Sequence, residues 1–96
     1  MDNPRQKTYL TVEKIGYEDG VYYTMEVYYD PDQLMPYYSY GYAMASGVKL
    51  TDWGISQFDQ EEAYSQETKD YLIRELRPSV KTQLQHLTRI GANYNG

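Results

Sequence analysis

The residues of this chain that could do chemistry are few and stand apart in the sequence. His86 is the only histidine, and a lone histidine can serve as a general acid or base near neutral pH. It lies near the end of a helical pattern among basic residues, where a histidine more often faces solvent or complements the helix dipole. Neither a Gly-x-Ser-x-Gly nucleophile elbow nor a Gly-x-x-x-x-Gly-Lys phosphate loop occurs in the sequence. We therefore expect a protein that is not an enzyme.

Acidic side chains offer a second possible chemistry, because divalent cations prefer oxygen ligands. Asp30 and Asp32 flank Pro31, and one such pair is better explained by a turn in which an aspartate side chain bonds the backbone. Glu61 and Glu62 are adjacent and favour the start of a helix electrostatically. The chain has no cysteine, which removes disulfides and thiolate metal ligands. We expect neither a metal nor another cofactor.

Tyrosine is the residue that distinguishes this chain. Ten of its thirteen tyrosines lie between Tyr9 and Tyr42. The ring is apolar and its hydroxyl is polar, so tyrosine suits a partly buried surface and is enriched at the centres of protein interfaces. Three interpretations follow: the rings fill a small core, they form a protein interface, or they stack on the bases of single-stranded nucleic acid.

The charge of the chain weighs against nucleic acid and against membranes as partners. The net charge is −5, and residues 1–50 carry four basic side chains against seven acidic ones. A phosphate-backbone binder and an anionic membrane surface both require a basic footprint. The charge is also uneven, with −5 over residues 52–70 and +3 over residues 71–96. These features favour a protein partner.

Alternation with a period of two predicts three strands, over residues 7–15, 21–29 and 37–45. Asp19-Gly20, between the first two, is typical of a tight hairpin turn. The third strand sorts its residues by size, so that one face carries Ser39, Gly41, Ala43 and Ala45 and the other carries Tyr38, Tyr40, Tyr42 and Met44. Small residues leave room for another element to approach, but periodicity does not decide which face is covered. Ser46-Gly47 and residues 51–57 are interpreted as a connecting segment.

Two helices are expected after residue 58. Asp59 is a suitable N-cap, and Glu62 has the spacing of a capping box. Apolar residues at helical spacing predict helices over 60–77 and 78–90, divided at Pro78, or one helix kinked there. Arg89 and Gly91 are typical of a helix end. The second helix has an apolar stripe of Val80, Leu84, Leu87 and Ile90.

Together these elements predict a single α+β domain, a three-stranded antiparallel meander with two C-terminal helices packed on one sheet face. Ninety-six residues suit one modest core. Residues 1–6 and 92–96 are expected to be flexible ends. The N-terminal segment lacks the apolar stretch of a signal peptide, and no stretch has the length and apolarity of a membrane span. We expect a cytoplasmic protein.

Tyrosine density without catalytic motifs predicts a non-enzymatic protein–protein interaction module. We expect a small accessory or structural subunit that forms a homodimer or joins a larger assembly. The alternative is an acidic inhibitor, of the kind found in phages or mobile elements, that offers Asp59, Glu61, Glu62 and Glu67 to a nucleic-acid-handling protein in place of DNA or RNA. The residues expected to contact the partner are Tyr22, Tyr28, Tyr38, Tyr40, Tyr42, Trp53, Arg74, Arg77 and Lys81.

Overall fold

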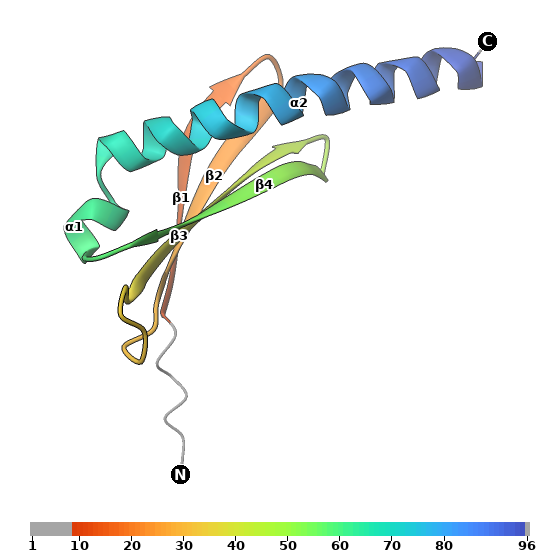
Figure 1. Ribbon diagram of the computed structural model, residues 1–96. Coiled ribbons are helices and arrows are strands. Elements are labelled where there is room, and N and C mark those ends of the chain that lie inside the picture. The colour runs from red at the N-terminus through yellow and green to blue at the C-terminus, as the bar shows by residue number, and fades with distance from the viewer. Residues whose placement is uncertain (1–8, 96) are drawn as a thin grey trace.

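The computed structural model describes the backbone of residues 9–95 and the side chains of residues 10–86. The first predicted flexible end, the start of the first predicted strand and residue 96 lie outside this part. The fold is α+β, as predicted, with one four-stranded antiparallel sheet followed by helices (Figure 1). Its elements are β1 (Tyr9–Glu18), β2 (Val21–Tyr29), β3 (Tyr37–Ala45), β4 (Val48–Gln57), α1 (Gln60–Ala63) and α2 (Gln66–Asn95).

The sheet is a meander in which each strand pairs with its neighbour in sequence, in the order β1-β2-β3-β4. The predicted bounds of β2 and β3 are confirmed. Both outer hairpins turn through two residues with positive φ, Asp19 (50°) and Gly20 (83°) in one and Ser46 (51°) and Gly47 (79°) in the other. Two consecutive positive φ angles define the type I′ turn, whose twist matches that of paired strands.

The prediction of three strands was wrong by one, because residues 48–57 form β4 and not a connecting segment. β4 pairs with β3 along its whole length, with a register shift between Ala43 and Met44. Its alternation is obscured by polar and glycine residues, Lys49, Asp52 and Gly54 among them. As an edge strand it is mostly exposed, so it needs few apolar side chains.

Both helices lie on one face of the sheet, which we call the helix face (Figure 1). Val21, Tyr23, Met25 and Val27 of β2 point toward the helices and are at most 1% exposed. Leu72, Leu76 and Val80 of α2 complete the core from the other side. The small residues of β3 make this packing possible. A Cβ atom added to Gly41 would lie 3.0–3.2 Å from three side-chain atoms of Leu72.

α1 begins as predicted. The Asp59 side chain accepts a hydrogen bond from the Glu62 N–H, and the Glu62 carboxylate accepts one from the Asp59 N–H, which completes the capping box. The buried Ser39 hydroxyl donates to the Ala63 carbonyl at 3.0 Å and joins α1 to the sheet.

Of the two alternatives predicted around Pro78, the single helix is found and the division into two helices was wrong. This helix, α2, runs from Gln66 to Asn95 with Pro78 inside it and continues past the predicted end at residue 90. The buried residues Leu76 and Val80 hold the helix on the sheet on both sides of Pro78, which is itself exposed. Packing on this face outweighs the hydrogen bond that proline cannot make. Within residues 9–95, α2 included, no helix has an apolar run long enough to cross a membrane.

Candidate functional site

The face of the sheet opposite the helices is the candidate site. Both helices lie on the other side (Figure 1), and no further element among residues 9–95 covers this face. Strand register assigns its residues, because directly opposed residues of antiparallel strands share a face. We call this surface the tyrosine face; it comprises Leu10, Val12, Lys14, Tyr17, Tyr22, Thr24, Glu26, Tyr28, Tyr38, Tyr40, Tyr42, Met44, Lys49, Asp52, Gly54 and Ser56.

All five tyrosines named as partner-binding residues from the sequence lie on this face. Tyr22 and Tyr38 are 46% and 41% exposed, and the other three are half-buried among their neighbours. Leu10, Val12 and Tyr17 on β1 extend the apolar surface, with exposures of 48%, 56% and 60%. Sequence reasoning did not name these three residues.

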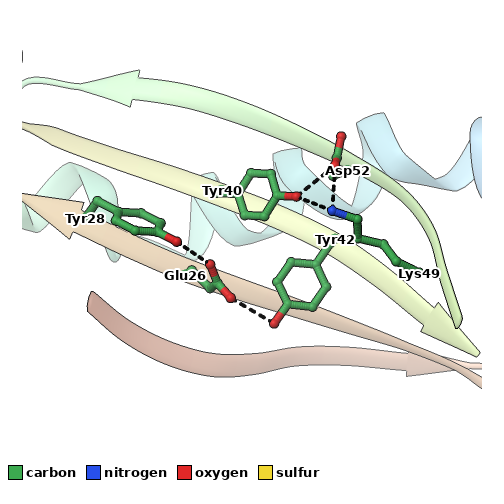
Figure 2. Close-up of polar contacts among 6 residues, drawn as sticks. All are labelled: Glu26, Tyr28, Tyr40, Tyr42, Lys49 and Asp52. Carbon is green, nitrogen blue, oxygen red and sulfur yellow. Dashed lines mark hydrogen bonds and ion pairs between the residues drawn. The ribbon is translucent and has the colours of Figure 1, made fainter. Parts of the chain in front are cut away.

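Glu26 lies at the centre of the tyrosine face and fixes two rings. Its two carboxylate oxygens accept hydrogen bonds from Tyr28, at 2.7 Å, and from Tyr42, at 3.0 Å (Figure 2). The bond to Glu26 and partial burial raise the pKa of Tyr28 to about 12. Desolvation, followed by the bond to Glu26, raises the pKa of Tyr42 above its ordinary value. Both phenols therefore stay protonated near neutral pH and serve as hydrogen-bond donors, not as bases.

A second polar group fixes Tyr40. Its hydroxyl donates to Asp52 Oδ2 at 2.7 Å and accepts from Lys49 Nζ at 2.7 Å, while Lys49 and Asp52 form an ion pair at 3.0 Å (Figure 2). The hydrogen bond from Tyr40 and the nearby ammonium lower the pKa of Asp52. The hydrogen bonds to Tyr40 and Asp52 raise the pKa of Lys49. The three side chains hold one another in place across β3 and β4.

The rings of the tyrosine face also contact one another. Ring centroids are 4.6 Å apart for Tyr17 and Tyr22 and 5.6 Å apart for Tyr40 and Tyr42. Tyr38 leans over Gly54 so closely that an added Cβ atom would overlap its ring and hydroxyl. Gly54 is thus required for the position of Tyr38. The rings form a preorganised surface and not a set of independent side chains.

The tyrosine face is neutral although the chain carries −5. Its charged residues are two lysines, Lys14 and Lys49, and two carboxylates, Glu26 and Asp52. Lys14 lies over the Tyr22 ring at 5.1 Å, and Lys49 is paired with Asp52. The surface consequently combines exposed aromatic area with no net charge.

The remaining residues named from the sequence lie elsewhere. Trp53 pairs with Gly41 and so belongs to the helix face, at the β4 edge, where it is 43% exposed. Arg77 forms a two-bond contact with Glu18, at 3.1 Å and 2.7 Å, which ties α2 to the end of β1. Arg74 lies over the Tyr71 ring at 5.4 Å, and Lys81 borders a hollow next to Arg77. The structure therefore does not bring these four residues together with the five tyrosines.

The other chemical candidates have local structural roles. Asp30 Oδ1 accepts a hydrogen bond from the Asp32 N–H at 3.1 Å, as the turn interpretation predicted. Glu62 serves the capping box, and His86 is exposed on α2. No group of three side chains suited to a metal ion occurs in the part of the chain that the structure describes.

Comparison with known proteins returned no match to a protein-family model, to a curated protein or to a solved structure.

Proposed function

We propose that this chain is a non-enzymatic protein-binding module, a small accessory or structural subunit, that self-associates through the tyrosine face. The observation that carries this proposal is an uncovered sheet face rich in tyrosine rings, three of which, Tyr28, Tyr40 and Tyr42, already donate their hydroxyl protons to Glu26 or Asp52. Rings that are fixed before binding lose little side-chain entropy when a partner covers them. Tyrosine is also among the residues that dominate binding energy at interfaces.

Charge supports a second copy of the chain as the partner. Two chains of −5 repel at long range, but their tyrosine faces meet without net charge. The exposed area on Leu10, Val12, Tyr17, Tyr22 and Tyr38 would be removed from water in such a complex. A homodimer, alone or within a larger assembly, is the simplest arrangement that covers this face.

Two other candidate functions, the acidic inhibitor and base stacking on single-stranded nucleic acid, receive less support. For the acidic inhibitor, Asp59 and Glu62 already accept backbone hydrogen bonds at the start of α1. For base stacking, the tyrosine face offers only Lys14 and Lys49, and Lys49 is paired with Asp52. A cytoplasmic location remains a prediction from the sequence.

Sedimentation equilibrium of the purified chain tests the proposal. We expect a reversible dimer or larger oligomer, and replacement of Tyr40 and Tyr42 by alanine should raise its Kd at least about tenfold. Lys81→Ala, an exposed change on α2 away from the face, is the matched control and should leave the Kd unchanged.

Circular dichroism of the same variants separates binding from folding. Helical content should persist in the double tyrosine variant. A wild-type chain that stays monomeric at all accessible concentrations would contradict the proposal. If the double variant lost helical content together with association, the two rings would be shown to stabilise the fold and not the interface.

A further inference from the structure

One end of the tyrosine face contains a hollow of about 930 Å³. Pockets of ~300–1,000 Å³ commonly accept compact ligands, so this hollow can take several side-chain atoms. Its floor is formed by tyrosine-face residues of three strands and its rim by the loop between β2 and β3. Its lining includes Tyr28, Tyr38 and Tyr40 from the floor, Ser56 from β4, and Leu34 and Met35 from the rim.

The rim loop, residues 30–36, is closed by its own hydrogen bonds. The Asp30 N–H donates to the Pro36 carbonyl at 2.8 Å, and the Gln33 N–H donates to the Asp30 carbonyl at 3.0 Å. This closed loop presents Leu34 at 95% exposure and Met35 at 42%. A single exposed leucine is ordinary, but this one borders an aromatic hollow on the same surface.

We propose that Leu34 of each copy inserts into the aromatic hollow of a second copy, so that two loops and two hollows interlock about a two-fold axis. This inference rests on the proposed self-association and specifies its contact. In a two-fold interface the same patch serves both subunits, so a projection beside a hollow meets its complement on the partner. A closed loop is a suitable projection because little of its entropy is lost on insertion.

The chemistry of the hollow fits an aliphatic occupant. Three phenol rings line the floor, and Asp30, the one charged residue among the described lining residues, has its carboxylate in the turn bond to the Asp32 N–H. Tyr28 and Tyr40 already donate their hydroxyl protons to Glu26 and Asp52. Two of the three phenol donors are therefore already used, and the hollow offers the occupant mainly ring and aliphatic surface.

Sedimentation of Leu34→Ala measures the contribution of the projection. Each dimer loses two buried leucine side chains, so we expect the Kd to rise at least about 100-fold. The change lies on an exposed loop tip, and the urea unfolding midpoint should not move when it is measured in protein dilute enough that association does not contribute. Val48→Ala, 51% exposed on the helix face of the β4 edge, is the aliphatic control and should leave the Kd unchanged.

Cysteine cross-linking tests the position of Leu34, because the chain has no cysteine of its own. Leu34→Cys chains mixed with Ser56→Cys chains should form an intermolecular disulfide under mild oxidation. Such a bond requires Cα atoms within ~7 Å of each other. Leu34→Cys mixed with Lys81→Cys is the matched control and should not cross-link.

The outcomes distinguish this inference from the proposed function. A wild-type chain without self-association overturns both and leaves the hollow to a foreign ligand. A wild-type dimer that Leu34→Ala does not weaken, and that yields no Leu34–Ser56 cross-link, overturns only the interlocked loops.

Discussion

The two faces of the sheet solve the same burial problem by different means. On the helix face, Ser39, Gly41 and Ala43 alternate along β3 so that Leu72 and its helix approach closely. On the tyrosine face, residues of the same strand are large, and the hydroxyls of Tyr40 and Tyr42 are bonded to Asp52 and Glu26. Small side chains are required on the helix face, whereas hydrogen bonds between tyrosines and carboxylates hold the side chains of the tyrosine face. Changes on the helix face should therefore alter stability, whereas changes on the tyrosine face should mainly alter association.

The largest effect is expected for Leu72→Ala. Leu72 is 0% exposed beneath α2, so its truncation leaves a cavity and should lower the free energy of unfolding by about 2–5 kcal/mol. The matched aliphatic change on the tyrosine face is Val12→Ala, at 56% exposure, which should cost less than about 0.5 kcal/mol. Urea unfolding measures both, in dilute protein so that association does not contribute. Equal losses of unfolding free energy in the two variants would show that the two faces contribute alike to stability.

A smaller loss is expected for Gly41→Ala, which adds one methyl group where Leu72 leaves no room. The new Cβ atom would lie 3.0–3.2 Å from Leu72, and overpacking should cost about 1–3 kcal/mol. Combining it with Leu72→Ala should recover part of the loss, because the methyl group then enters the space that leucine vacated. Strictly additive free energies in this double-mutant cycle would show that the two sites do not touch.

Glu26→Gln tests the polar pairing of the tyrosine face. The raised pKa of Tyr28, about 12 against an ordinary 10.0, means that the fold favours the protonated phenol. This stabilisation is fully present below pH 10 and is lost as the pH rises through about 12. Removing the carboxylate should move tyrosinate formation, followed by ultraviolet absorbance, to lower pH. It should cost about 1 kcal/mol in stability near neutral pH. An unchanged titration curve would show that Glu26 does not hold the ring.

The smallest effect is expected for Arg77→Gln, which removes the exposed ion pair between Arg77 of α2 and Glu18 at the end of β1. The Arg77 hydrogen bonds lower the pKa of Glu18, so this contribution is present above the ordinary pKa of 4.5 and is lost as the pH falls through the lowered value. Both side chains are about half exposed, so Arg77→Gln should cost only about 0.2–1 kcal/mol. A loss above 2 kcal/mol, measured by urea unfolding near neutral pH, would place this pair among the main determinants of helix docking.

The parts of the fold that follow from local pattern could be predicted from the sequence. The strict alternation of β2 and β3 gave their bounds, and the Asp59 and Glu62 spacing gave the capping box. β4 was missed because its polar residues hide the alternation, although Ser46-Gly47 takes the same turn as Asp19-Gly20 and could have indicated a second hairpin. At Pro78 the local pattern was strong but was overridden. Proline disfavours a helix interior, yet the packing of Leu76 and Val80 in the core keeps the helix continuous through it.

The candidate site was predictable in its residue types but not in its arrangement. Size sorting along β3 assigned Tyr38, Tyr40 and Tyr42 to one face, but the packed contacts of the other face, such as Gly41 with Leu72, were needed to show that the helices lie there. Glu26 and Asp52 were not named. Tyr42 and Tyr40 reach them across strands, which depends on register, although Tyr28 bonds Glu26 from two residues away on the same strand. Trp53 was placed with the tyrosines by its ring, whereas the register of β4 turns it to the helix face.

The meander order of the sheet has a kinetic consequence. Each strand lies beside its neighbour in sequence, so no long loop must close before a strand can pair. The two I′ turns allow each outer hairpin to form locally, and isolated hairpins form in ~1–10 μs. We expect refolding to be fast for a β-rich chain, with docking of α2 as the later event. The entropy of joining distant segments is small in this fold, and the time to reach the native state should be set by helix packing on the finished sheet.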